Sequence, residues 1–442
     1  MDVMKRTRPV LTLSGRVINE ALSFIVFCAL DLVDYVLCFV FKAIDMLIEA
    51  ECIPCYCSSS AKEAIKSSGK ILVSEKGGES TKIVSLSSTK LMLEDISDTL
   101  YSRPSLVSEL SNFTLNELKK LKLEDPILQQ QTTKAGTSHC SGSSFKVNTT
   151  IVEMLQGKAK EDVLFIHGFI SSSLFWTETL FPNFSRRARL RYRLFAIDLL
   201  GFGRSPKPSE SLYTLNEHLE MIERSVLEAH NVKCLHIVAH SLGCILALAL
   251  AVKHPNSVKS LTFLAPPFYE VPKGEEAHAT QYVMRKIAPR RVWPIISLGA
   301  SLVCWYEHIT RMICFLICKN HRFWEFLAKL LTRNRVRTFL LEGFFCHTHN
   351  AAWHTLHNII CGTAGKIGTY LDDIKNNPNV EVTIFHGKDD EVIPIECSYG
   401  VQRRIPRAHV RVIDKKDHIT IVVGRQKVFA RELEEIWNNM NN

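Results

Sequence analysis

The stretch AHSLGC, residues 239–244, constrains the fold of this chain more than any other feature. It follows an apolar run typical of a β-strand, residues 234–238, and precedes a stretch with helical character. A sharp turn from strand to helix around a serine admits only small side chains two positions away on either side. Ala239, where glycine is usual, and Gly243 both meet this demand. We therefore predict that Ser241 sits on such a turn with its hydroxyl lifted clear of a sheet, ready to act as a nucleophile.

From about residue 147 onward, the chain alternates between short apolar runs and segments of helix length. Continuous apolar strands that alternate with helices predict an α/β fold with a mostly parallel, doubly wound sheet covered on both faces. The run 426–438 has the pattern of a closing helix. The predicted strands are residues 162–167, 192–198, 235–239, 261–265, 380–386 and 410–413.

One stretch, residues 266–375, interrupts this alternation with a helical, aromatic-rich segment. Its part from Glu270 to Lys375 has 14 Lys and Arg against 8 Asp and Glu, which gives +6 of the +9 net charge of the chain. An insertion after the fourth predicted strand lies over the carboxyl ends of the strands, where open α/β sheets bind ligands. We interpret it as a helical lid over a substrate with a fatty chain and an anionic part. The alternative is that its charges form an ordinary solvated face.

A serine hydroxyl needs a positioned base and an acid that orients that base. The stretch HGKDDEVIP, residues 386–394, follows a predicted strand and supplies the acid. Asp390 fits the usual spacing after glycine and before proline in such a loop, and Asp389 is the alternative. His418 follows the last predicted strand and is the candidate base. It is preceded by Asp417, where a glycine often stands.

The negative charge that develops during acyl transfer requires backbone N–H donors that already point at it. We expect one donor from Leu242, directly after the serine. The second is expected from Phe169 in the loop after the first predicted strand, where the small Gly168 allows close approach of the backbone. His167 is included in the candidate site, as the residue that holds this loop.

Other chemistries find little support in the sequence. Four histidines of the predicted lid could in principle bind a metal, but no carboxylate is spaced to complete such a site. We predict no metal and no cofactor. The chain also lacks a basic tract with interleaved aromatic residues, so nucleic acid is not an expected partner. The four histidines are His347, His349, His354 and His357.

Residues 1–50 have the character of a hydrophobic or amphipathic anchor or of a signal segment. After a basic start, six charged residues from Glu20 to Glu49 fall within a wedge of roughly 80° when placed at 100° intervals, and the rest of the circumference is almost wholly apolar. Such a helix suits a membrane with its polar stripe against a partner, an in-plane anchor at the interface, or packing on the protein's own core. If it spans, the basic flank predicts a cytoplasmic N-terminus. The six residues of this wedge are Glu20, Asp31, Asp34, Lys42, Asp45 and Glu49.

The next segment, residues 51–146, is rich in Ser and Lys and is predicted to be a linker that leads to a single catalytic domain over residues 147–442. Cys52, Cys55 and Cys57 lie directly after the apolar segment. Juxtamembrane cysteines are candidates for a lipid anchor. The alternative is that they are ordinary thiols.

The motifs from residue 160 onward resemble those of the α/β-hydrolase superfamily. The whole chain resembles the plant BODYGUARD family, described as probable lysophospholipases, including the ECIPCYC stretch at 51–57 and HGFISSS at 167–173. The resemblance implies a triad of Ser241, Asp390 and His418, with His167 in the oxyanion loop. It also implies a role in the cuticle, in cutin and suberin deposition, and a location at the cell membrane or in the cell wall.

Three functions stay open at this point. The first is a serine esterase or lipase, associated with a membrane, whose partners are acyl lipids such as lysophospholipids. The second is an acyltransferase with the same triad, in which an alcohol replaces water. The third is a non-catalytic receptor or scaffold on a hydrolase fold.

Overall fold

The computed structural model describes residues 3–48, 149–152, 161–208, 211–272, 274–275, 278–333 and 338–439. The predicted linker and the three candidate anchor cysteines lie outside these residues.

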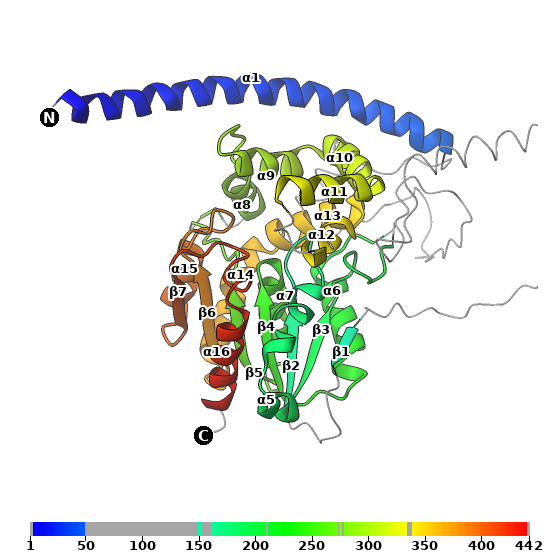
Figure 1. Ribbon diagram of the computed structural model, residues 1–442, viewed down its shortest axis with the longest axis vertical. Helices are drawn as coiled ribbons and strands as arrows, with labels where there is room; N and C mark the ends of the chain where they lie inside the picture. Colours follow the sequence, from blue (N-terminus) through cyan, green and yellow to red (C-terminus); the bar gives the residue numbers. More distant parts are fainter. Residues whose placement is uncertain are drawn as a thin grey trace, which may run out of the picture.

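A seven-stranded sheet forms the centre of the structure (Figure 1). Its strand order is β1-β3-β2-β4-β5-β6-β7, in which β1 pairs antiparallel to β3 and all other neighbours are parallel. The predicted α/β class with a mostly parallel sheet is therefore confirmed. The strands are β1 (Thr149–Val152), β2 (Glu161–Ile166), β3 (Tyr192–Ile197), β4 (Leu235–His240), β5 (Val258–Leu264), β6 (Glu381–Gly387) and β7 (His409–Ile413).

Helices cover both faces of the sheet because successive residues of each strand point to opposite sides. In β2, Leu164 and Ile166 join one buried apolar cluster, whereas Val163 and Phe165 join the other. The first cluster is completed by α6 (Leu215–Ile222), the π-helical turn η2 (Glu223–Glu228), α7 (Leu242–Lys253), α14 (Ala364–Asn376) and α15 (Glu396–Arg404). The second is completed by α4 (Leu174–Thr177), η1 (Phe181–Asn183), α5 (Arg186–Arg191) and α16 (Gln426–Asn439).

Two details of the sheet differ from the prediction. β5 begins at Val258, three residues before the expected start, and β1 was not predicted at all. β1 has only four residues and pairs at the sheet edge, so neither its length nor its pattern distinguishes it from a loop.

The interrupting segment forms a layer of helices beyond one end of the strands (Figure 1). Its last predicted part, α14, instead packs on the sheet through Ile367, Leu371 and Ile374. We therefore use the name lid for residues 278–363. The lid contains α8 (Ala279–Ile287), α9 (Ile295–Trp305), α10 (Glu307–Lys319), α11 (His321–Leu331), α12 (Thr338–Phe345), α13 (His349–Thr355) and the π-helical turn η4 (Leu356–Cys361).

A single long helix, α1 (Val3–Ile48), runs across the outer side of the lid, over α9 and α10 (Figure 1). Its segment Val17–Asp45 is long and apolar enough to cross a membrane. Length and composition alone do not separate a spanning helix from a signal segment or an interfacial one, because all three share these properties. The contacts of α1 are therefore the informative feature.

Candidate active site

Ser241 lies on the turn between β4 and α7 in a strained backbone conformation, with φ at 51° and ψ at −123°. A non-glycine residue in this region is held there by its surroundings. Here the Ser241 N–H donates to the Leu264 carbonyl oxygen at 2.8 Å. Gly243 is required, because a Cβ at this position would come within 2.6 Å of the His167 carbonyl oxygen. The turn therefore needs the small residues that the sequence places around the serine.

Asp390 follows β6 and accepts three hydrogen bonds. Its Oδ1 accepts from the N–H groups of Val392 and Ile393, at 2.8 and 2.9 Å. Its Oδ2 accepts from Nδ1 of His418 at 2.8 Å, and the Asp390 side chain is only 1% exposed. The neighbouring Asp389 is exposed. Of the two aspartates, Asp390 is therefore the one that faces His418.

The surroundings of Asp390 keep it ionised. Burial alone would raise its pKa, but the hydrogen bond and charge of His418 and the two backbone N–H groups outweigh burial, and the pKa is lowered. His386 supports the same loop, with Nε2 donating to the Ile393 carbonyl at 2.9 Å and Nδ1 2.6 Å from the Ser398 hydroxyl. Burial lowers the pKa of His386. A charged carboxylate thus faces the proposed base in a fixed direction.

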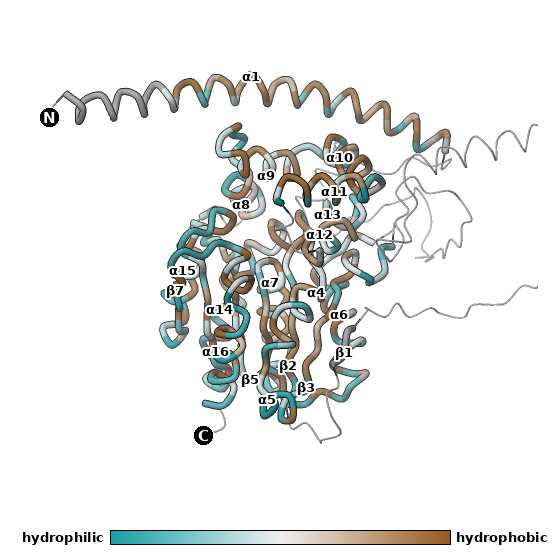
Figure 2. The backbone as a smooth tube through the Cα atoms, in the orientation of Figure 1, coloured by the Kyte–Doolittle hydropathy of each residue, from teal (hydrophilic) through white to brown (hydrophobic). Residues whose placement is uncertain are grey.

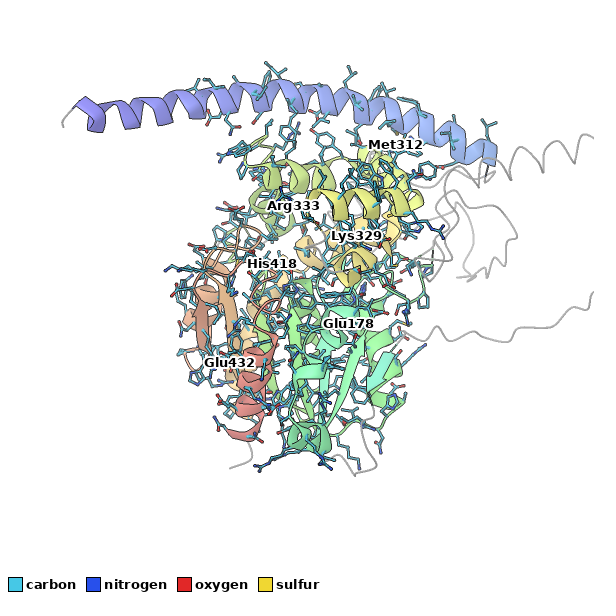
Figure 3. All side chains as sticks on the ribbon, viewed as in Figure 1. Glu178, Met312, Lys329, Arg333, His418 and Glu432 are labelled. Atoms are coloured by element: carbon cyan, nitrogen blue, oxygen red, sulfur yellow. The ribbon has the colours of Figure 1, made fainter. Side chains whose placement is uncertain are left out.

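His418 lies at the end of the sheet that faces the lid (Figure 3). The preceding Asp417 shapes its loop, since its Oδ1 accepts from the N–H groups of Ile419 and Thr420 at 3.0 and 2.8 Å. The Asp417 N–H donates in return to the Thr420 hydroxyl at 2.8 Å. Burial would raise the pKa of Asp417, but these hydrogen bonds lower it. An aspartate at the usual glycine position is therefore built into the loop.

His240 is a residue of the site that sequence reasoning missed. Its Nε2–H donates to the His418 carbonyl at 2.9 Å, and the centres of the two imidazole rings are 4.6 Å apart. Phe175 stacks on its ring at 5.1 Å. Burial, with a contribution from His418, lowers the pKa of His240 to about 3, so the ring is neutral. Its only sequence signal is its polar character directly before Ser241, after the apolar residues 237–239 of the strand.

The two expected oxyanion donors belong to segments that meet at the serine. A Cβ on Gly168 would be 3.1 Å from the Ser241 Cβ and 2.9 Å from the His240 Nδ1, so glycine lets the loop approach the nucleophile. Phe169, the next residue, also packs against the lid. Leu242 is the first residue of α7, and its N–H belongs to the first turn, which has no intrahelical acceptors. Both amides are therefore candidates to bind an oxyanion.

His167 holds the oxyanion loop through both ring nitrogens. Its Nε2 accepts from the Leu199 N–H at 3.0 Å, which leaves Nδ1–H to donate to the Gly168 carbonyl at 2.7 Å. Burial lowers the pKa of His167 despite the nearby Asp198. These contacts suit a positioning residue better than a group that exchanges protons with substrate.

Asp198 joins two loops around the site. Its Oδ1 accepts from the Ser173 N–H at 2.6 Å and its Oδ2 from the Arg204 N–H at 3.0 Å. Gly203 has a φ of 52°, and a Cβ there would come within 2.4 Å of the Asp198 carboxylate. The loop that carries Phe169 is thus tied to the turn after β3.

The lid histidines make local contacts. His357 uses both ring nitrogens on carbonyl oxygens, those of Trp353 and Cys304, at 2.8 and 3.0 Å. His347 contacts the Phe344 carbonyl at 2.6 Å. Among the residues that the structure describes, no group of three or more His, Cys, Asp or Glu could hold a metal ion.

Comparison with known proteins gives three findings. The family model for the alpha/beta hydrolase fold matches residues 163–293. The "Probable lysophospholipase BODYGUARD 3" of Arabidopsis thaliana is 54% identical over 99% of each chain, and "Probable lysophospholipase BODYGUARD 1" of the same plant is 52% identical over 96% of this chain and 97% of that one. The solved structure of MenH from S. aureus is 15% identical, covers 66% of this chain and 99% of its own, and has a TM-score of 0.47.

Proposed function

The chain belongs to the BODYGUARD family, and from this membership we propose that it is a serine hydrolase that cleaves acyl esters of lipids, in the manner of a lysophospholipase. That it is a hydrolase follows from its relatives and from the family model. The observation that carries the proposed chemistry is the buried Asp390–His418 pair, 2.8 Å between Oδ2 and Nδ1, beside the strained Ser241 turn.

In the proposed reaction, His418 takes the proton of the Ser241 hydroxyl as its oxygen attacks the ester carbonyl, and Asp390 orients the imidazole and stabilises its charged form. The N–H groups of Phe169 and Leu242 bind the negative oxygen of the tetrahedral intermediate. His418 then gives its proton to the leaving alcohol. Water, activated by the same histidine, hydrolyses the acyl-serine and regenerates the hydroxyl.

The substrate proposal rests on the lid and on the names of the relatives. Ser241 is 8% exposed and His418 is 9% exposed, so both residues are largely covered by the protein. The lid is cationic and aromatic-rich, which suits an amphiphile with a fatty chain and an anionic part. We propose a lysophospholipid or a related acyl ester, with a role in formation of the plant cuticle and a site of action at the cell membrane or in the cell wall.

Labelling with a fluorophosphonate probe tests the nucleophile. We expect the wild-type chain to be labelled, Ser241→Ala to be unlabelled, and the control Ser171→Ala in the neighbouring loop to be labelled as wild type. Circular dichroism checks that all three chains are folded. A folded wild type without label, or a labelled Ser241→Ala chain, contradicts the proposal.

Product analysis separates hydrolysis from transfer. The enzyme is given a lysophospholipid in water with a hydroxy fatty acid as a competing acceptor. The proposal predicts that free fatty acid is the main product. A new ester to the hydroxy acid as the main product assigns the chain to acyl transfer instead.

A further inference from the structure

One side of α1 is bound to the lid by residues that recur at spacings of three, four or seven positions. Such spacing places them on one face of a helix. They contact the segment before α9, the α9–α10 corner and α10 itself. The contacting residues are Asn19, Ser23, Phe27, Asp31, Asp34, Phe41 and Asp45.

Asp34 caps α10 from another helix. Its Oδ1 accepts from the N–H groups of His308 and Ile309, at 3.0 and 2.9 Å. These are amides of the first turn of α10, whose own preceding residue, Tyr306, provides no side-chain cap. A carboxylate at this place satisfies orphan donors and suits the positive end of the helix dipole. A residue of α1 thus completes a lid helix.

Two further acids bind cations of the lid. Asp31 lies 2.7 Å from the Arg290 guanidinium and accepts from the Tyr306 hydroxyl at 2.8 Å. Asp45 and Arg311 form a bidentate pair with both contacts at 2.8 Å. The side chains of this pair are 2% and 9% exposed, so separating them would leave a buried charge without its partner. The three aspartates of α1 are therefore all engaged within the protein.

Most of α1 from residue 17 onward is hydrophobic (Figure 2), and large apolar side chains on the side away from the lid are exposed. Large apolar residues at the start of the lid, Trp293, Ile295 and Ile296, are exposed as well, and the Trp293 carbonyl contacts Asn19 of α1. An exposed apolar surface of this extent marks an interaction site. The exposed residues of α1 are Val17, Ile18, Leu22, Phe24, Ile25, Leu32, Val33, Tyr35, Val36, Phe39, Val40 and Leu47.

We propose that α1 lies in the plane of a lipid surface as the outer layer of the lid, with its apolar side in the membrane interface and its polar stripe holding the lid. A spanning helix would carry Asp31, Asp34 and Asp45 into the bilayer, away from the lid groups that satisfy them. An in-plane helix keeps every one of these contacts and buries only its apolar side. We identify the partner of the exposed side of α1 as a lipid surface. From Glu20 onward, the charged residues of α1 lie in one wedge and leave an apolar side over 29 residues, about 43 Å of helix.

This arrangement determines which part of the protein faces the lipid. The lid lies between α1 and the ends of the strands (Figure 1). It therefore faces the membrane, and on the proposed function a lipid substrate would enter from that side. The membrane contact itself does not depend on the proposed chemistry.

Protease protection of the full chain on sealed microsomes, with an epitope tag on each terminus, tests the topology. We expect both tags to stay on the membrane-bound chain and to share one side, so that protease removes both or neither. Tags on opposite sides show a spanning helix and overturn the proposal. Loss of the N-terminal tag by cleavage during maturation also overturns it.

Flotation with vesicles of phosphatidylcholine and phosphatidylserine tests the surface. Val36→Asp places a charge on the exposed side of α1, and we expect it to weaken binding at least tenfold, about the effect of one misplaced charge in an apolar interface. The matched control is Val428→Asp, a similarly exposed valine of α16. Equal binding by both variants, or flotation of the wild type only when a membrane protein is added, overturns the proposal. Fluorophosphonate labelling of the wild type tests the proposed serine nucleophile independently of membrane binding.

A charge exchange tests whether α1 holds the lid. Arg311→Asp should increase cleavage of the lid by protease, and the double variant Arg311→Asp with Asp45→Arg should restore part of the protection. Cleavage of Arg311→Asp at the wild-type rate contradicts the coupling. A double variant cleaved as fast as the single one contradicts it too.

Discussion

The Nε2–H of His240 donates to the carbonyl oxygen of His418, 2.9 Å away, and the centres of their rings lie 4.6 Å apart. Since His240 directly precedes Ser241, the strained turn and the loop of the proposed base are joined by one side chain. The base is thereby held from two sides, by Asp390 at its ring and by His240 at its backbone. The second support acts on position and not on charge, because burial lowers the pKa of His240 and keeps its ring neutral.

Replacing His240 tests whether it positions the loop of His418. We expect His240→Phe to lower kcat by about 10- to 100-fold, since it removes a buried hydrogen bond of about 1–3 kcal/mol. His240→Gln retains a donor and should lose less. The measurement is kcat and KM on a short-chain ester, and KM should change little. A His240→Phe enzyme with wild-type kcat would remove His240 from the site.

The two adjacent aspartates offer a matched pair. Asp390→Asn should lower kcat by about 10⁴-fold, because the amide favours the wrong tautomer of His418. Asp389→Asn, at an exposed position, should leave kcat within about twofold of wild type. If the larger loss occurred at Asp389, the assignment of the acid would be wrong.

The same pair predicts a pH dependence of stability. The pKa of Asp390 is lower in the folded chain than its ordinary value of 3.8. Its stabilisation is therefore present above about pH 4 and is lost as the pH falls through the folded-state pKa. Thermal midpoints should fall less steeply below pH 4 for Asp390→Asn than for wild type, with Asp389→Asn following wild type. Parallel curves for all three chains would show that Asp390 has no lowered pKa.

The oxyanion loop can be tested by adding a single methyl group. Gly168→Ala would place a Cβ 2.9 Å from the His240 Nδ1 and 3.1 Å from the Ser241 Cβ, so the loop must move away. We expect kcat to fall by up to about 10²-fold. The control is Gly299→Ala in α9, where an added Cβ would meet nothing within 4 Å beyond its own chain neighbours and helix backbone, and the helix should gain about 0.5–1 kcal/mol. Unchanged kcat in Gly168→Ala would show that the close approach is not needed.

The cap provided by Asp34 can be removed without changing the sequence of the lid. Asp34→Ala should destabilise the start of α10 by about 1 kcal/mol, the usual cost of losing a capping side chain. Hydrogen exchange of the first amides of α10 reports this change directly, as faster exchange. Glu20→Ala, on an exposed position of α1, is the control and should leave α10 as in wild type. Equal exchange in both variants would show that the cap does not stabilise α10.

The positions of six strands along the chain and the place of the insertion could be predicted, because each parallel strand is an apolar run and the lid breaks their alternation with helices. Prediction failed where the pattern is too short, as in β1, or where a helix such as α14 follows the lid without a change in composition. Asp390 faces His418 as its spacing indicated, and its catalytic role stays a prediction.

The rest of the site and the contacts of α1 could not be predicted, because they join residues that are far apart in the sequence. The polar wedge of residues 20–49 was compatible with a partner in the membrane, with an in-plane anchor and with packing on the protein itself. It did not identify the lid, where Asp34 accepts from the N–H of His308, 274 residues further along the chain. The role of His240 was hidden for the same reason, since its acceptor lies 178 residues further on. Local spacing reveals a face or a motif, and only the folded chain reveals the surface against which it packs.

The spacing of the α1 residues that contact the lid also limits which insertions and deletions the gene can accept. Each residue inserted into a helix turns the rest of that helix by 100° and moves it by 1.5 Å. One extra codon between Asp34 and Asp45 would leave the cap of α10 in place and swing Asp45 away from Arg311. An added pair of turns would restore the direction but overshoot the arginine by about 10 Å. An anchor helix that only has to be apolar would tolerate such insertions and deletions. In α1, by contrast, the number of residues between the contacts with the lid must stay constant.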